Sequence, residues 1–161
     1  MKRTEFCENI DKYKEQLYII AYTILKNETD TEDAVCNAIL KAYEHLNELK
    51  NPQSFKSWMI TITKNEALHI KRKRLNLPGD DKVEEMLLPV LDSYNELWDV
   101  VQNLKEEYRL VIVLFYYNNL SLKEISKVLN IPIGTVKSRL NRGRELLKTV
   151  LDEDEKGDNN D

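Results

Sequence analysis

Residues 121–148 constrain the fold more than any other part of the chain, because their pattern predicts two short helices around a tight turn. Ser121 and Glu124 can form a capping box at the start of the first helix. Asn130 suits a left-handed helix end, and Pro132 suits the first turn of a following helix. The break therefore falls between Asn130 and Pro132, and the stretch is predicted to be a helix-turn-helix.

The second of these helices has an apolar side and a polar side when its residues are placed at 100° intervals. The apolar side carries Val136, Leu140, Gly143 and Leu147, and the outward side carries Ser138, Asn141, Arg142 and Glu145, flanked by Lys137, Arg144 and Lys148. Residues 121–148 hold seven Lys or Arg and two Glu, a charge of +5 within a chain of net charge −4. Such a helix fits the DNA major groove, where Arg and Lys favour guanine, Asn favours adenine and Ser is permissive. The alternative is a solvated basic helix that binds nothing.

Glycine and proline are scarce, with four of each among 161 residues, which favours helices over a turn-rich β fold. The sequence therefore predicts an all-α protein. It contains no apolar run of the roughly 18 residues needed to cross a bilayer and no signal-peptide pattern, so we expect a cytoplasmic protein. Cys7 and Cys36 lie outside any metal-binding spacing, and we expect reduced, partly buried thiols.

Charge is unevenly distributed along the chain. Residues 51–78 have six Lys or Arg against one Glu, and residues 79–107 have nine acidic residues against two Lys. The basic segments 51–78 and 121–148 are thus separated by an acidic one. An overall isoelectric point near 5.4 does not argue against nucleic-acid binding by either basic segment.

The N-terminal half is predicted to form three helices. The first has apolar residues at helical spacing between Ile10 and Ile24. Thr29 and Glu32 can form a capping box for the second helix, which would leave the acids of its first turn exposed. The third begins at Asn51-Pro52, faces Phe55, Trp58, Met59 and Ile62 inward, and ends in a basic run.

We expect a domain at 1–75, a linker at 76–92 containing Pro78-Gly79 and Pro89, and a helix-turn-helix domain at 93–151. The apolar run RLVIVLFYY within the second domain is read as a buried helix that supports the helix-turn-helix. Residues 152–161, DEDEKGDNND, contain no apolar side chain and are predicted to be disordered.

Three blocks of the sequence resemble the bacterial extracytoplasmic-function (ECF) sigma factors of the sigma-70 family. DTEDAVCNAILKAY, from Asp30 to Tyr43, is similar to the family's polymerase-binding helix. FKSWMITITKNEALHIKRKR, from Phe55 to Arg74, is similar to its minus-10 helix. LSLKEISKVLNIPIGTVKSRLNRGRELL is similar to its minus-35 reader. The three blocks in this order are specific to the family.

The resemblance implies roles for individual residues. Core RNA polymerase would be bound by Asp30, Glu32, Asp33 and Asn37. The minus-10 region of promoter DNA would be bound by Trp58, Lys64, Asn65, Lys71, Arg72, Lys73 and Arg74, with Asn65 lining a pocket for a flipped-out base. The minus-35 element would be read by Lys137, Ser138, Arg139, Asn141, Arg142 and Arg144.

The partners implied are core RNA polymerase, promoter DNA and a membrane-tethered anti-sigma protein that inserts between the domains. Two other interpretations stay open, a stand-alone helix-turn-helix regulator and a decoy that binds only regulatory proteins. The regulator would leave the block from Asp30 to Tyr43 unused, and the decoy would need no basic recognition face. The sequence has no glycine-rich phosphate loop, metal-ligand spacing or Ser, His and acid set, so we predict no enzyme, cofactor or small-molecule substrate.

Overall fold

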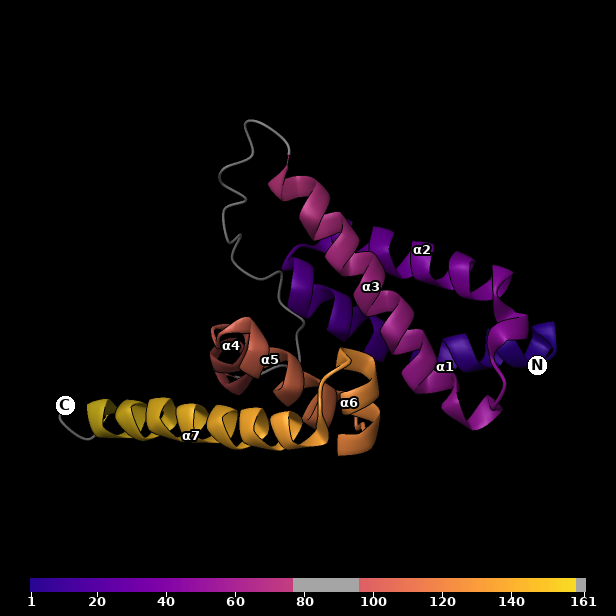
Figure 1. The fold of residues 1–161 in the computed structure, drawn as a ribbon. Coiled ribbons are helices and arrows are strands. Elements are labelled where there is room, and N and C mark those ends of the chain that lie inside the picture. The colour runs from indigo at the N-terminus through magenta and orange to yellow at the C-terminus, as the bar shows by residue number, and fades with distance from the viewer. Residues whose placement is uncertain (77–95, 159–161) are drawn as a thin grey trace. The chain divides into compact units, whose positions relative to one another are not determined.

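The computed structural model describes residues 1–76 and 96–158, and every element within those ranges is a helix. The chain divides into two compact units, Met1–Pro89 and Val90–Asp161, each of which is described by itself (Figure 1). The prediction of an all-α chain with two small helical domains is confirmed. Apart from Asn76, the predicted linker at 76–92 lies outside the described residues.

Unit 1 is a bundle of three long helices, α1 (Arg3–Leu25), α2 (Glu28–Glu44) and α3 (Phe55–Leu75), each of which packs against the other two (Figure 1). Two short 3₁₀ turns, Leu46–Glu48 and Pro52–Ser54, join α2 to α3. The bundle core consists of fully buried large side chains, namely Leu17, Ile20, Tyr22, Phe55, Met59 and Ile60. Each such side chain contributes about 1.5 to 3 kcal/mol through removal from water.

The corner between α1 and α2 is capped by Asn27 instead of the predicted Thr29. Lys26 ends α1 in the left-handed region at φ 56°, and α2 already begins at Glu28. The Asn27 Oδ1 accepts a hydrogen bond from the Asp30 N–H at 2.9 Å. Asparagine is a strong N-cap residue, and it stands where the chain first leaves α1, so the Thr29 capping box is not formed.

Helix α3 buries a different face from the predicted one. Phe55 and Met59 are buried as expected, whereas Trp58 and Ile62 are only half-buried. Because α3 packs against both α1 and α2, its buried stripe is broader, and it also includes Ile60, Thr63 and Ala67. The Thr63 hydroxyl is satisfied there, since it donates to the Met59 carbonyl at 2.8 Å.

Unit 2 contains α4 (Glu96–Gln102), α5 (Glu106–Ile112), a π-helical turn η3 (Val113–Tyr117), α6 (Leu122–Leu129) and α7 (Ile133–Asp158). The run RLVIVLFYY forms α5 and η3, which confirms that it is a buried helix and not a strand. Its side chains Val111 to Leu114 are at most 1% exposed. The core around them is completed by Trp98, Val101, Ile125, Val136 and Leu140.

Helices α5 and α7 approach closely at Gly143. A Cβ atom at Gly143 would lie 2.9 Å from Cγ1 and 3.1 Å from Cδ1 of Ile112, which is 1% exposed. Those distances are too short for a side chain, so the absence of one at Gly143 lets the helix that carries the basic face pack directly on its support.

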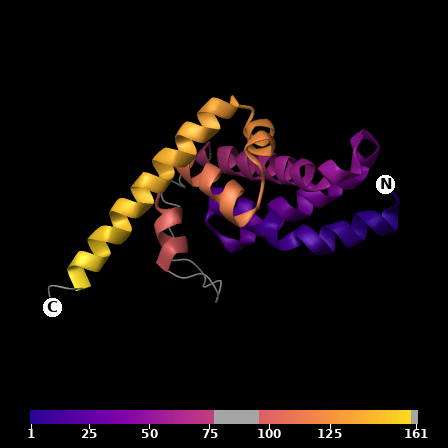
Figure 2. The same ribbon diagram turned by 90° about the horizontal axis from the view of Figure 1, so that it is seen from below.

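The prediction of disorder from residue 152 is wrong as far as Asp158, because α7 continues to that residue (Figures 1 and 2). The prediction rested on the lack of apolar residues to bury. Once the upstream turns of α7 are formed, however, adding a residue costs no new nucleation, so the helix continues into this polar segment without packing. Residues 159–161 lie outside the described part.

Candidate nucleic-acid interface

The helix-turn-helix is formed by α6, the turn at Asn130 and α7. Glu124 N–H donates to Ser121 Oγ at 3.1 Å and Ser121 N–H to Glu124 Oε1 at 3.3 Å, so the predicted capping box is present. Asn130 adopts the left-handed conformation at φ 53°, as predicted. The Ser126 hydroxyl donates to the Ile131 carbonyl at 2.6 Å and fixes the turn. These local bonds set the position of the first turn of α7.

The orientation of α7 agrees with the predicted layout. Val136, Leu140 and Gly143 are buried against the rest of unit 2. Among the six predicted minus-35 residues, Arg139 is half-buried and the other five are exposed, namely Lys137, Ser138, Asn141, Arg142 and Arg144. One outward surface therefore carries Lys and Arg side chains, which only donate hydrogen bonds, and Ser and Asn side chains, which also accept them. Reading the edges of bases requires both kinds.

Arg142 lies on this surface with an acidic neighbour. Its NH1 lies 3.2 Å from Glu145 Oε2, and both side chains are more than half exposed, at 56% and 68%. An exposed pair at this spacing contributes well under about 1 kcal/mol to stability. Arg142 can therefore exchange Glu145 for a base or phosphate at small cost.

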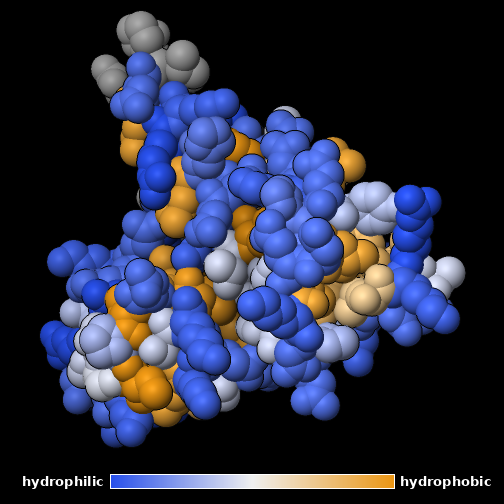
Figure 3. Space-filling model, turned by 45° about the vertical axis from the view of Figure 1, so that its right-hand side comes forward, coloured by the Kyte–Doolittle hydropathy of each residue, from blue (hydrophilic) through white to orange (hydrophobic). Residues whose placement is uncertain are grey.

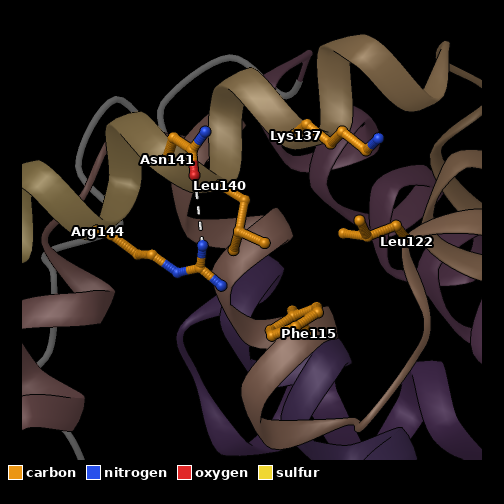
Figure 4. A pocket seen from close by; sticks show the side chains of 6 residues that line it. All are labelled: Phe115, Leu122, Lys137, Leu140, Asn141 and Arg144. Atoms are coloured by element: carbon orange, nitrogen blue, oxygen red, sulfur yellow. Dashed lines mark hydrogen bonds between the residues drawn. The ribbon is translucent and has the colours of Figure 1, made fainter.

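Arg144 is held differently, since its guanidinium turns back over the aromatic residues of η3. Its Nε donates to the Tyr116 hydroxyl at 2.6 Å, and its NH1 donates to Asn141 Oδ1 at 3.3 Å. A pocket of about 240 Å³ is lined by Phe115, Leu122, Lys137, Leu140, Asn141 and Arg144. Figure 4 shows these six side chains.

The sequence analysis missed Phe115 and Tyr116 as part of this site. Tyr116 is 49% exposed, although the run that contains it was assigned entirely to the core. The run ends in three aromatic residues, Phe115 to Tyr117, directly before Asn118-Asn119, and nothing in that pattern shows which of the three is exposed.

The second basic region is the C-terminal half of α3. Asn65, Arg72 and Lys73 are exposed, and Trp58, Lys64 and Lys71 are half-buried. Burial lowers the pKa of the Lys64 ammonium below its ordinary value. Figure 3 shows mainly hydrophilic side chains, with a few hydrophobic ones among them, toward the end of α3. This part of α3 therefore presents one amide and several cations together.

Arg74 and Asp30 were predicted to serve two different partners, but they bind each other. Arg74 Nε lies 2.6 Å from Asp30 Oδ2, and Arg74 NH2 donates to Asp30 Oδ1 at 2.8 Å. The Asp30 side chain is 8% exposed, so the expectation that the acids of this first turn are all exposed is wrong for Asp30. The reason is the packing of the α3 C-terminus over the α2 N-terminus, which buries the carboxylate and supplies its counter-charge.

The other three predicted polymerase-binding residues, Glu32, Asp33 and Asn37, are exposed on α2. Leu40 follows Asp33 and Asn37 on the same face at helical spacing and is 64% exposed, which is unusual for a large apolar side chain. The sequence analysis did not select it. Its departure from the buried stripe Ala34, Ala38 and Ala42 was the signal that Leu40 faces outward.

Tyr18 lies near this acidic part of α2. Burial raises the pKa of its hydroxyl above the ordinary value, and the negative charges of Glu28 and Glu32 raise it further. Charges on α2 are therefore felt by a neighbouring side chain on α1.

Within residues 1–76 and 96–158, no group of three or more His, Cys, Asp or Glu side chains could hold a metal ion. In the same ranges, no helix combines the length and apolar character that crossing a bilayer demands. Cys7 and Cys36 are both free and exposed, which corrects the expectation of partly buried thiols. Each occupies an outward position on its helix, because the inward positions around it are taken by larger apolar residues or by the alanine stripe of α2.

Comparison with known proteins matches each unit to one family description. Sigma-70 region 2 matches residues 10–75, and sigma-70 region 4 matches residues 94–147. The ECF RNA polymerase sigma factor SigW of Bacillus subtilis is 31% identical, with 91% of this chain and 88% of SigW covered. RNA polymerase sigma factor SigV of the same organism is 29% identical, with 88% of both chains covered.

Two solved structures have a similar fold. The sigma factor RpoE in complex with the anti-sigma factor NepR, from Bartonella quintana, has a TM-score of 0.78 at 22% identity and covers 92% of this chain and 97% of its own. CnrH in complex with the cytosolic domain of CnrY has a TM-score of 0.68 at 21% identity and covers 95% of this chain and 91% of its own.

Proposed function

The chain belongs to the ECF sigma factors of the sigma-70 family, and from this premise we propose which of its surfaces perform the work of such a protein. It binds core RNA polymerase and directs promoter recognition and transcription initiation, and it is not an enzyme. The observation that carries the assignment of surfaces is the exposed, cation-rich face of α7 on a fully formed helix-turn-helix.

Core polymerase is bound by the outward face of α2. Glu32, Asp33 and Asn37 supply charge and polarity, and Leu40 supplies an apolar anchor beside them. An apolar side chain ringed by polar ones is the usual composition of an interface centre. Asp30 is not part of this surface, because its carboxylate is engaged by Arg74 inside unit 1.

The minus-10 region is bound by α3. Asn65 is exposed and offers both a donor and an acceptor to the edge of a base taken out of the stack. Phosphates near that base are neutralised by Lys64, Lys71, Arg72 and Lys73. The lowered pKa of Lys64 supports a position where water is partly excluded. Trp58, half-buried against Phe55 with ring centroids 6.1 Å apart, stiffens the start of this helix.

The minus-35 element is read by α7 in the major groove. Lys137, Ser138, Asn141 and Arg142 face outward from the first three turns, which is where a recognition helix contacts base edges. Arg139 is half-buried and contributes charge from the side of the helix. The remaining predicted reader, Arg144, is engaged by its neighbours Tyr116 and Asn141.

Control of the chain is exerted by a separate anti-sigma protein. The similar structure of the sigma factor RpoE is a complex with the anti-sigma factor NepR, and that of CnrH is a complex with the cytosolic domain of CnrY, which supports a membrane-tethered inhibitor for this chain too. The chain itself would act in the cytoplasm, where polymerase and promoter DNA are found. The exposed Leu40 face is available for such an inhibitor, which would then compete with polymerase.

Run-off transcription with core polymerase and a library of genomic promoters tests the proposal. We expect core polymerase to initiate at a defined set of promoters only when the chain is added. Specific promoter binding by the chain alone, at nanomolar concentration and physiological salt and without any effect on polymerase, would instead identify a stand-alone helix-turn-helix regulator.

A further inference from the structure

Arg144 is held in place by three independent interactions. Its guanidinium carbon lies 5.5 Å from the ring centre of Phe115 and 5.6 Å from that of Tyr116, within the range of cation–π attraction. Its Nε donates to the Tyr116 hydroxyl at 2.6 Å. Phe115 and Tyr116 in turn pack edge to face, with ring centres 4.9 Å apart, so the platform beneath Arg144 is itself ordered.

The third interaction joins Arg144 to a predicted base reader. Arg144 NH1 donates to Asn141 Oδ1 at 3.3 Å, and the two residues are three positions apart on α7. Figure 4 shows the Asn141 oxygen turned toward Arg144 and its nitrogen turned away. Because guanidinium has donors and no acceptor, it can bond only the oxygen of the amide, which fixes the amide orientation.

This orientation affects which base Asn141 can recognise. Asparagine reads adenine with both ends of its amide, accepting from N6 and donating to N7. Arg144 occupies one of the two acceptor positions of the Asn141 oxygen and holds that oxygen toward itself, so the NH₂ donor is the end of the amide that is turned away from Arg144. Guanine offers two acceptors in the major groove, O6 and N7, and no donor beside them.

We propose that Arg144 is a positioning residue which holds Asn141 as a hydrogen-bond donor, so that Asn141 reads guanine in preference to adenine within the minus-35 element. The proposal rests on the proposed reading of that element by α7. Arg144 then acts through Asn141 and is not itself a phosphate contact, which distinguishes it from the neighbouring cation Lys148.

The test uses holoenzyme and a promoter library randomised across the minus-35 element. Asn141→Ala first identifies the base pair that Asn141 reads, as the position where base preference is lost. At that base pair, Arg144→Met is expected to raise the preference for adenine over guanine by about fivefold or more. This is the low end of what a bidentate contact of asparagine with adenine contributes. Tyr116→Phe keeps the ring and removes the acceptor for Nε, so we expect a smaller change in the same direction.

Two controls separate positioning from loss of charge or structure. Lys148→Met removes a cation from the same flank of α7, and we expect weaker binding to all promoters with unchanged base preference. In the Asn141→Ala background, Arg144→Met should produce no further change at the identified base pair. Unfolding midpoints of the four single variants show whether any of them has lost its fold. If Arg144→Met is unfolded, the base preference of Tyr116→Phe tests the proposal instead.

The outcomes are distinct. If Arg144→Met weakens every promoter equally and lowers the salt dependence, Arg144 is a phosphate contact and the inference is overturned. If Asn141→Ala changes no base preference while the holoenzyme still depends on the minus-35 element, Asn141 reads no base. The inference then fails, and the proposed function stands. If no promoter is used at all, the proposed function fails with it.

Discussion

The carboxylate of Asp30 and the guanidinium of Arg74 form a two-point ion pair across 44 positions of the chain, with Nε–Oδ2 and NH2–Oδ1 distances of 2.6 and 2.8 Å. Asn27 adds a third bond, because its Nδ2 donates to Asp30 Oδ2 at 3.0 Å. The start of α2 and the end of α3 are thus joined by a hydrogen-bonded network. The resemblance assigned Asp30 to polymerase binding and Arg74 to DNA binding, but in unit 1 the two residues bind each other.

Asp30→Ala should lower the free energy of unfolding of unit 1 by about 1 to 3 kcal/mol. A buried carboxylate–guanidinium pair is costly to break from one side, although the Arg74 side chain is 36% exposed and can partly rehydrate. Chemical denaturation of the single and double variants measures this. Arg74→Met in the Asp30→Ala background should cost less than it does alone, and equal costs would show that the two residues are not coupled.

Arg72→Gln and Arg74→Gln should differ in their effect on promoter binding by the holoenzyme. Arg72 is exposed, and removing one phosphate contact is expected to reduce the slope of log K against log salt by about 1. Arg74 is engaged by Asp30, so its loss should leave the slope nearly unchanged at salt concentrations where the protein stays folded. Equal reductions of the slope would mean that Arg74 leaves Asp30 on binding DNA.

Asp33→Lys should weaken association with core polymerase about tenfold or more, because it reverses a charge on the proposed binding face of α2. Leu40→Ala should also weaken it, through loss of the apolar anchor. Glu15→Lys is the matched control, since it makes the same charge reversal at an exposed position on α1. Competition binding to core polymerase measures the affinity of all three variants. If Glu15→Lys binds as weakly as Asp33→Lys, the loss is a general effect of charge.

Arg142→Ala should reduce discrimination at one base pair of the minus-35 element by about 1 to 3 kcal/mol, as expected for the loss of a bidentate contact to guanine. Its ion pair with Glu145 is exposed, so thermal stability should change little. Promoter selection from a randomised minus-35 library measures the discrimination. A uniform loss across all sequences would assign Arg142 to phosphate instead.

Gly143→Ala should destabilise the protein by about 1 kcal/mol, because the crowding against Ile112 outweighs the better helix propensity of alanine. Gly134→Ala is the matched control on the same helix, where no atom lies within 4 Å of the added Cβ. It should stabilise by about 0.5 kcal/mol or more. Thermal unfolding measures the change in stability of both variants. Equal shifts of the unfolding temperature would show that α7 relaxes away from α5 in Gly143→Ala.

Features set by nearby residues were predicted well from the sequence. The Ser121 capping box, the left-handed Asn130 and the two-sided α7 all depend on residues within one or two helical turns of each other. Resemblance to a family then supplied the order of the two units. The corner at Asn27 was missed because Asn27 and Thr29 are both capping residues, and the cap forms at Asn27, where the chain first leaves α1.

Features set by packing between distant helices could not be predicted. The pairing of Asp30 with Arg74 requires the crossing of α2 and α3, which no local pattern contains. The exposure of Leu40 could be predicted from helical spacing, whereas the exposure of Tyr116 depends on the irregular turn that contains it. The prediction of disorder after residue 151 was wrong as far as Asp158. Composition predicts whether a separate segment folds, whereas this segment continues a helix that is already formed.

The π-helical turn at Val113–Tyr117 makes the length of this segment critical. Asn118 N–H donates to the Val113 carbonyl at 3.0 Å, five residues back, so the turn holds one residue more than an α-helix would. Deleting a single residue here would restore a regular helix and rotate everything that follows by about 100° relative to α5. The contacts of Arg144 with Phe115 and Tyr116 therefore depend on the number of residues in this turn as well as on their identity.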